Sequence, residues 1–144
     1  MPTAENMILL VEDDPDHEAL AIRALRKANV ANEIKVARDG AEAIEYMNGI
    51  ASGVNAMPQL VLLDLKLPKV EGLDVLRAIR AADKTALLPV VVLTSSDEER
   101  DIVASYRLGV NSYIRKPVNF TDFAEATKQL GMYWLLLNQC PPTP

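Results

Sequence analysis

The stretch VLLDLKLPKVEG, residues 61–72, decides the fold of this chain and raises its main question. Five of its first seven residues are apolar, which is typical of a strand that is buried on both faces. Asp64 nevertheless lies within this run, between Leu63 and Leu65. An ionised carboxylate in an apolar setting is costly unless another group pairs with it. The rest of the sequence should therefore supply partners for Asp64.

Apolar segments of strand length alternate along the chain with segments of helical periodicity. This alternation predicts an α/β fold, in which helices cover a parallel sheet. Asp14, which stands before Pro15, is a predicted helix N-cap. The second and fifth predicted strands are less apolar than the others, so we expect them to be weaker strands or edge strands of the sheet. We expect strands at 7–11, 33–37, 60–64, 89–94 and 111–115, and helices at 15–29, 39–49, 71–82, 97–108 and 119–137.

Length and composition limit the class of protein. A chain of 144 residues with 49% apolar and 24% charged residues is typical of one soluble domain. The net charge of -5, without any run of Lys or Arg, argues against nucleic acid or an anionic membrane as the main partner. The chain has a single cysteine, no apolar stretch long enough to span a bilayer and no signal-peptide pattern at its start, so we expect a cytoplasmic protein.

Polar residues follow four of the predicted strands at the point where each strand ends. Glu12 and Asp13 follow the first strand, Asp64 ends the third, Thr94 ends the fourth and Lys116 follows the fifth. Ligand sites of parallel sheets lie at this edge, so these side chains are expected to meet there. Carboxylates this close repel one another unless a hard cation such as Mg2+ holds them ionised. Such a site is equipped for phosphoryl transfer to a carboxylate, here Asp64.

Four motifs carry a resemblance to a known family: LLVEDD (9–14), LVLLDLKLP followed by EG (60–72), VVVLTSS (90–96) and YIRKP (113–117). Together they resemble the signatures of the response-regulator receiver domain, of the chemotaxis-regulator type. The resemblance covers about residues 7–130 and implies a five-stranded, doubly wound (βα)5 flavodoxin-like fold. It also implies a two-component phosphoacceptor protein that takes phosphate from a histidine kinase onto Asp64. Such a protein is not an enzyme, since it catalyses only its own phosphorylation and slow autodephosphorylation.

The resemblance implies a role for each site residue. Asp13, Asp64 and the backbone carbonyl of Lys66 would bind Mg2+ directly, and Glu12 would act through metal-bound water. Thr94 would donate a hydrogen bond to the phosphoryl group, and Lys116 would pair with it.

Tyr113 occupies the place of the aromatic switch residue in the family. When Thr94 moves toward the phosphate, the Tyr113 ring would turn into the space that Thr94 leaves. This movement would carry the state of Asp64 to the face formed by the fourth helix, the fifth strand and the fifth helix. The alternative is that Tyr113 merely packs in an edge strand.

The segment MYWLLL, residues 132–137, is a candidate interaction site. One helical face cannot bury six consecutive side chains, and an exposed apolar patch of that size marks a contact with another molecule. We expect a homodimer, the commonest oligomer, with Tyr133, Trp134, Leu136 and Leu137 in the interface. The alternative is that this segment packs on its own domain. The expected organisation is one receiver domain over 1–144, with a core at about 7–130 and an extended C-terminal helix and tail at about 131–144.

A second, narrower resemblance concerns the partner. The stretch EIKVARDGAEAIEYM (33–47), the long loop before the third strand and the tail YWLLLNQCPP (133–142) resemble the single-domain regulators that accompany bacterial and cyanobacterial phytochromes. This implies a phytochrome-type histidine kinase as the input and dimerisation through the last helix.

Two other functions remain open at this stage. One is a dimeric scaffold with a receiver fold that works without phosphate. The other is a metal-dependent phosphatase with an aspartyl nucleophile, which would need a second Asp two residues after Asp64, where Lys66 stands. His17, early in the first predicted helix, is expected to be a solvated side chain.

Overall fold

A computed structural model describes residues 7–27, 32–95, 98–116 and 120–131 of the chain, and within these ranges five strands alternate with five helices. The strands are β1 (Met7–Val11), β2 (Glu33–Ala37), β3 (Leu60–Leu63), β4 (Val90–Thr94) and β5 (Ser112–Arg115). The helices are α1 (Pro15–Lys27), α2 (Gly40–Ala51), α3 (Gly72–Ala81), α4 (Glu99–Arg107) and α5 (Phe120–Gly131). The ten predicted elements are confirmed in kind and order. The extension predicted beyond residue 131, with its interface residues, lies outside the described residues.

The five strands form one parallel sheet in the order β2-β1-β3-β4-β5. The prediction that β2 and β5 lie at the edges is therefore confirmed. Every residue of β1, β3 and β4 is buried, whereas Glu33 and Lys35 of β2 are exposed. The apolar content of each strand thus matches its position, because central strands of a parallel sheet are covered on both faces.

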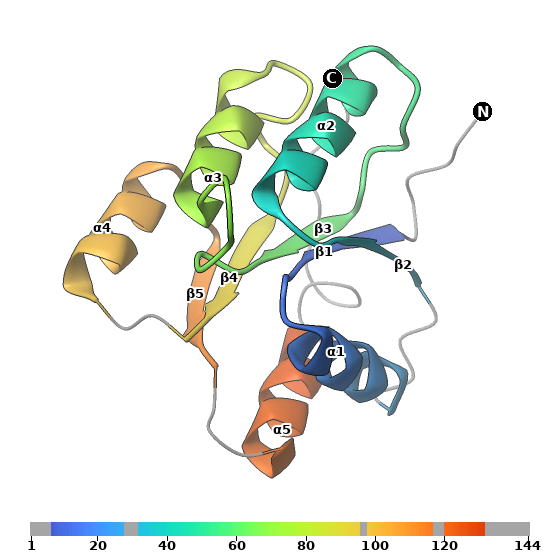
Figure 1. The fold of residues 1–144 in the computed structure, drawn as a ribbon, viewed down its shortest axis with the longest axis vertical. Coiled ribbons are helices and arrows are strands. Elements are labelled where there is room, and N and C mark those ends of the chain that lie inside the picture. Colours follow the sequence, from blue (N-terminus) through green and yellow to red (C-terminus); the bar gives the residue numbers. More distant parts are fainter. Residues whose placement is uncertain (1–6, 28–31, 96–97, 117–119, 132–144) are drawn as a thin grey trace.

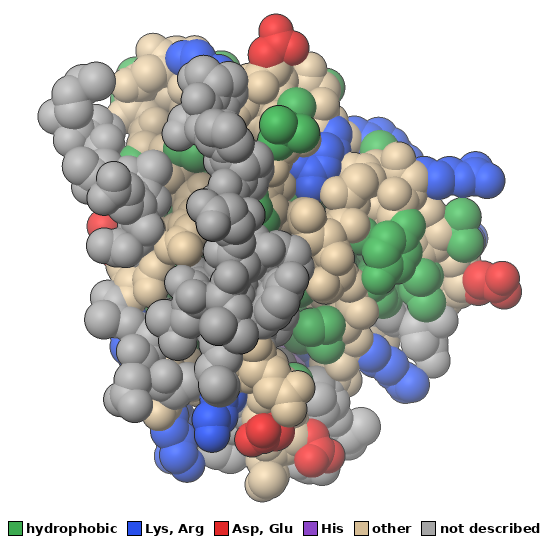
Figure 2. All heavy atoms as spheres, turned by 180° about the vertical axis from the view of Figure 1, so that it is seen from behind, with side chains coloured by type: hydrophobic (Ala, Val, Ile, Leu, Met, Phe, Trp, Pro, Cys, Tyr) green, Lys and Arg blue, Asp and Glu red, His purple; other side chains and the backbone are tan. Residues whose placement is uncertain are grey.

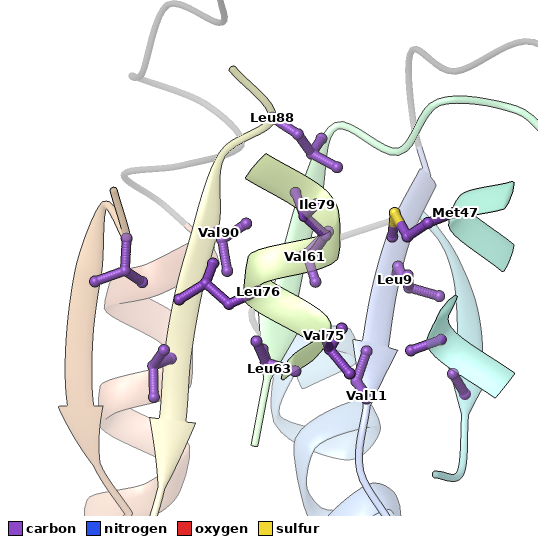
Figure 3. Packing of buried hydrophobic residues seen from close by; sticks show 14 of the residues in the cluster. Leu9, Val11, Met47, Val61, Leu63, Val75, Leu76, Ile79, Leu88 and Val90 are labelled. Carbon is purple, nitrogen blue, oxygen red and sulfur yellow. The ribbon is translucent and has the colours of Figure 1, made fainter. Parts of the chain in front are cut away.

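Helices cover both faces of the sheet (Figure 1): α1 and α5 lie on one face, and α2, α3 and α4 lie on the other. Successive strand residues point to opposite faces. Ile8 and Leu10 accordingly belong to one buried cluster with Leu25 of α1. Leu9 and Val11 belong to a second cluster beneath α2 and α3 (Figure 3). These two cores hold the sheet in place as a platform for the residues at its edge.

Helix ends follow the chemistry of their caps. Asp14 caps α1, since its Oδ1 atom accepts hydrogen bonds from the backbone N–H groups of Asp16 at 2.9 Å and His17 at 3.3 Å. Helix α4 begins at Glu99 rather than at 97, and its N-cap residue Glu98 makes no side-chain cap hydrogen bond. The residues SDEE at 96–99 resemble a capping box, and this pattern places the start of the helix two residues too early.

Helix α2 extends two residues beyond its predicted end at 49. It continues through Gly49 to Ala51, and the backbone N–H of Ser52 still bonds to the carbonyl of Asn48 at 3.0 Å. Gly53 then adopts a φ of 83°, the left-handed conformation with which helices commonly end. The loop predicted to start at residue 50 therefore starts at residue 52. Within the described part of the chain, no helix is long and apolar enough to cross a membrane.

Candidate functional site

The structure brings the predicted site residues together at one edge of the sheet. Glu12 and Asp13 follow β1, Asp64 follows β3, Thr94 is the last residue of β4 and Lys116 follows β5. The strand order reverses between β1 and β3, which is where parallel α/β sheets place their ligand sites. Glu12, Asp64, Thr94 and Lys116 are all buried, whereas Asp13 is exposed.

Asp64 is held by three hydrogen-bond donors. Its Oδ1 atom accepts from the Thr94 hydroxyl at 2.7 Å and from the Lys66 backbone N–H at 3.0 Å. Its Oδ2 atom accepts from Lys116 Nζ at 2.9 Å. Burial alone would raise the pKa of Asp64, but the Lys116 ammonium, the Lys66 N–H and the Thr94 hydroxyl together lower it below the ordinary value. Asp64 is therefore ionised and held in a fixed orientation at neutral pH.

Glu12 shares the same ammonium group, because Lys116 Nζ also donates a hydrogen bond to Glu12 Oε1. Burial raises the pKa of Glu12 to about 7, and its ion pair with Lys116 only partly opposes this effect. The nearby Asp64 carboxylate adds to the rise. One ammonium thus serves two buried carboxylates. Asp64, which has two further donors, remains ionised, and Glu12 sits close to its titration point.

Three carboxylates can close around a cation. Glu12, Asp13 and Asp64 each offer one oxygen atom, and these atoms lie within 4.8 Å of one another. Two of these residues are buried and the third is exposed, so the cluster has an open side toward solvent. An all-oxygen set with one open side fits Mg2+ or a similar hard cation, which retains water in part of its coordination shell. The donor set present therefore fits the cation that the sequence predicts.

Gly72 allows α3 to begin directly against the end of β3. A Cβ atom on Gly72 would lie 2.4 Å from the Asp64 carbonyl oxygen and 2.5 Å from Leu65 Cα. The Gly72 N–H also donates to the Leu65 carbonyl at 3.1 Å. A larger residue here would displace either α3 or the Asp64 backbone. Gly72 belongs to the motif at 60–72, but no local pattern indicates its contact with Asp64.

The two predicted switch residues lie on adjacent strands. Thr94 is fully buried and reaches Asp64, as described above. Tyr113 of β5 is half-buried, lies opposite Val92 of β4 and packs against the buried cluster beneath α2 and α3. Val92 and Thr94 point to the same face of β4, since they are two residues apart. Tyr113 is therefore on the strand next to Thr94, opposite a residue two positions before it, and in contact with the core.

The expectation that His17 is a solvated side chain is met only in part. Its side chain is 39% exposed, but its Nδ1 atom lies 2.9 Å from Lys116 Nζ, within the site. Only the folded chain brings together two residues that are 99 positions apart, so no sequence spacing could indicate this contact.

Similar proteins identify the family to which this chain belongs. The sequence pattern of the family described as "Response regulator receiver domain" matches residues 8–128. The chain is 39% identical over 135 residues to a probable methanogenesis regulatory protein, FilR2, of Methanothrix harundinacea, covering 94% of this chain and 87% of FilR2. It is 37% identical over 130 residues to response regulator Rcp1 of Synechocystis sp., covering 90% of this chain and 88% of Rcp1.

Two solved structures are similar over nearly the whole chain. The Mn(2+)-bound form of Rcp1 has a TM-score of 0.88 at 35% identity and covers 95% of this chain and 99% of its own. The phosphorylated cyanobacterial phytochrome response regulator RcpA has a TM-score of 0.89 at 37% identity and covers 96% of this chain and 100% of its own. The chain described here therefore belongs to the response regulator receiver domain family and acts in phosphorylation-based signalling.

Proposed function

We propose that Asp64 is the phosphoacceptor of this response regulator. The observation that carries the proposal is the set of three donors around Asp64, which keeps the carboxylate ionised although it is only 5% exposed. A carboxylate nucleophile has to be ionised and oriented before it can attack phosphorus. Asp64 meets both conditions and lies beside the carboxylate cluster.

The phosphoryl donor is a phosphohistidine of a histidine kinase. One carboxylate oxygen of Asp64 attacks the phosphorus atom, and the P–N bond breaks. The electron pair of that bond stays on the imidazole nitrogen, which takes up a proton, and Asp64 becomes an aspartyl phosphate. The Thr94 hydroxyl and the Lys116 ammonium, which bind Asp64 before the reaction, turn to the phosphoryl oxygens after it. Water later hydrolyses the acyl phosphate slowly, so the protein turns over no external substrate and is not an enzyme.

The proposed cofactor is Mg2+, held by Asp13, Asp64 and the Lys66 backbone carbonyl, with Glu12 acting through metal-bound water. When bound, the cation supplies positive charge that offsets the charge of the phosphoryl oxygens. The carboxylate cluster and the Mn(2+)-bound form of the relative Rcp1 support a divalent cation here.

Phosphotransfer from a labelled kinase tests the assignment of Asp64. Asp64→Asn should abolish acid-labile labelling, because the amide is a poor nucleophile. Asp74→Asn is the matched control, since Asp74 is an exposed residue of α3 that pairs with Arg77 at 2.7 Å. It should be labelled like the unmodified protein. Persistent labelling of the Asp64→Asn variant would reject the proposal.

The phosphorylation signal passes through Thr94 and Tyr113 to the face formed by α4, β5 and α5. Helix α4 carries Val103 and Tyr106, which are 42% and 53% exposed, together with the exposed Arg107. Figure 2 shows hydrophobic and basic side chains close together on this side of the molecule. Such a mixed surface is suited to contact with another protein. The output is therefore proposed to be protein-protein contact.

The proposed kinase is of the phytochrome type. The similarity to RcpA over nearly the whole chain supports this pairing, together with the subfamily resemblance of the sequence. A phosphotransfer time course against every histidine kinase of the same organism tests it. The fastest transfer should come from a phytochrome-type kinase.

A homodimer is proposed to form through Tyr133, Trp134, Leu136 and Leu137, in an extension of a single receiver domain whose core spans about 7–130. Sedimentation with and without beryllofluoride and Mg2+ tests how phosphate relates to the dimer. A shift in association would support a phosphorylation-controlled dimer. Equal association in both states would favour the scaffold function, and a monomer in both would reject the dimer.

A further inference from the structure

His17, in the first turn of α1, contacts the ammonium group of Lys116. Its Nδ1 atom lies 2.9 Å from Lys116 Nζ, 3.7 Å from Asp14 Oδ2 and 3.9 Å from Glu12 Oε1. Of these three atoms, only the lysine nitrogen is within hydrogen-bond distance of Nδ1. The contact is therefore made with the lysine rather than with the carboxylates around it.

The chemistry of the two groups fixes the direction of this hydrogen bond. A lysine ammonium has three N–H donors and no acceptor. Two of the donors go to Glu12 Oε1 and Asp64 Oδ2. The third is left for His17 Nδ1, which has to accept. A neutral imidazole that accepts at Nδ1 carries its proton on Nε2, so the structure requires one particular tautomer of His17.

The cap of α1 holds His17 where this contact is possible. Asp14 Oδ1 accepts from the backbone N–H of His17 at 3.3 Å and from that of Asp16 at 2.9 Å. These two bonds fix the first turn of α1 relative to the end of β1. The His17 side chain consequently starts from a fixed backbone position directly beside the pocket.

We propose that His17 is a positioning residue for Lys116, and this inference rests on the proposed function of Asp64. The other two acceptors of the lysine, Glu12 and Asp64, belong to the carboxylate cluster that a divalent cation would also use. The hydrogen bonds from Lys116 to Glu12 and Asp64 therefore weaken when a cation binds to the cluster. His17 Nδ1 lies outside that cluster, so it continues to accept a hydrogen bond from the ammonium. The ammonium then stays directed at Asp64, ready to meet the incoming phosphoryl group.

The tautomer of His17 gives a test that needs no phosphorylation. Nitrogen-15 NMR of the histidine ring, observed in the metal-free protein and again with Mg2+, should show the ring proton on Nε2 and none on Nδ1. Since the chain has one histidine, the signal needs no further assignment. Lys116→Met should shift the Nδ1 resonance, because its donor is lost. A proton on Nδ1, or a resonance that does not respond to Lys116→Met, would overturn the proposal.

Phosphorylation kinetics give the second test, with acetyl phosphate as donor and saturating Mg2+. His17→Phe keeps a ring but has no acceptor, whereas His17→Asn places an oxygen close to the former position of Nδ1. Loss of one net hydrogen bond predicts a roughly three- to tenfold lower maximum rate for His17→Phe. The half-saturating donor concentration should not change, and His17→Asn should recover most of the rate. An unchanged rate in His17→Phe, or equal slowing in both variants, would contradict a positioning role.

Thermal unfolding of both variants checks that the fold is intact, and His17→Leu replaces His17→Phe if the larger ring disturbs α1. The two proposals fail in different ways. A wild-type protein that is not labelled, or label that survives Asp64→Asn, rejects the phosphoacceptor assignment, while the ring tautomer still decides the contact between His17 and Lys116. Normal labelling with the wrong tautomer rejects only the role of His17.

Discussion

Lys116 Nζ lies 2.9 Å from Asp64 Oδ2, although 52 positions separate the two residues in the sequence. The same nitrogen donates to Glu12, so one lysine offsets the charge of two buried carboxylates while no metal is bound. A divalent cation at the carboxylate cluster would use the same oxygen-bearing groups. The lysine and the cation therefore compete for them.

Replacing Lys116 with Met removes the positive charge and keeps the length of the side chain. The metal-free protein should lose about 3 kcal/mol of unfolding free energy at pH 8, because two carboxylates are left in a buried site without their partner. Mg2+ should bind more tightly than in the unmodified protein and restore much of the loss. Urea denaturation with and without Mg2+ measures both effects. Lys84→Met, at an exposed lysine, is the control, and weaker Mg2+ binding by Lys116→Met would contradict the competition.

Mg2+ binding should depend on pH through Glu12. Burial raises the pKa of Glu12 from 4.5 to about 7. The protonated Glu12 carboxyl thus stabilises the fold fully below about pH 4.5, and this stabilisation is lost as the pH rises through 7. The cation favours the ionised form, so Mg2+ should bind more weakly at pH 6 than at pH 8 and should release a proton at pH 6.

Calorimetry in buffers of different ionisation enthalpy measures that proton release. Glu12→Gln cannot titrate, so its Mg2+ affinity should lose the pH dependence around pH 7. Binding of Mg2+ at pH 6 without proton release would show that Glu12 is already ionised in the metal-free protein.

Gly72→Ala should harm both stability and phosphorylation. The added Cβ would lie 2.4 Å from the Asp64 carbonyl oxygen, so backbone has to move. We expect a loss of about 2 kcal/mol in unfolding free energy and slower labelling of Asp64 by acetyl phosphate. Ala81→Ser adds one heavy atom at the exposed end of the same helix and should change neither quantity. Wild-type labelling in Gly72→Ala would mean that the Asp64 backbone absorbs the added methyl group.

Arg80→Met should destabilise the fold far from the site. The Arg80 guanidinium, at the end of α3, donates to four backbone carbonyls in two separate segments: those of Ala86 and Leu88 before β4, and those of Leu108 and Gly109 after α4. Their loss should cost roughly 3 kcal/mol in unfolding free energy by urea denaturation, with phosphotransfer intact in the folded protein.

Arg77→Met is the matched control, because Arg77 lies one helical turn earlier and makes an exposed ion pair with Asp74. That pair should contribute less than about 1 kcal/mol. Similar losses in the two variants would mean that the carbonyl contacts of Arg80 do not stabilise the fold.

Much of the fold is predictable because burial and strand position follow the same pattern. The apolar runs of β1, β3 and β4 indicate central strands, and the charged Glu33 and Lys35 indicate that β2 lies at an edge. The location of the site is predictable as well, since parallel strands bring their carboxyl ends together. Asp64 can be identified from the sequence because it is a charged residue within an apolar run.

Other features depend on distances that no local pattern encodes. The contact of His17 with Lys116 and that of a Gly72 Cβ with Asp64 arise between segments that only the fold brings together. The pKa of Glu12 is about 7 because the residue is buried and shares the Lys116 ammonium with Asp64, and neither feature can be inferred from the neighbouring residues in the sequence. The start of α4 is placed too early for a different reason, because the SDEE pattern at 96–99 resembles a capping box.

The position of Lys116 after an edge strand has a mechanical consequence. Asp64 follows β3, which hydrogen-bonds to a strand on each side, whereas Lys116 follows β5, which within the described residues has a neighbouring strand on one side only. Asp64 therefore follows a strand that is held from both sides, and Lys116 follows a strand that is held from one side. Pressure on the outer edge of β5 should therefore displace Lys116 more readily than Asp64.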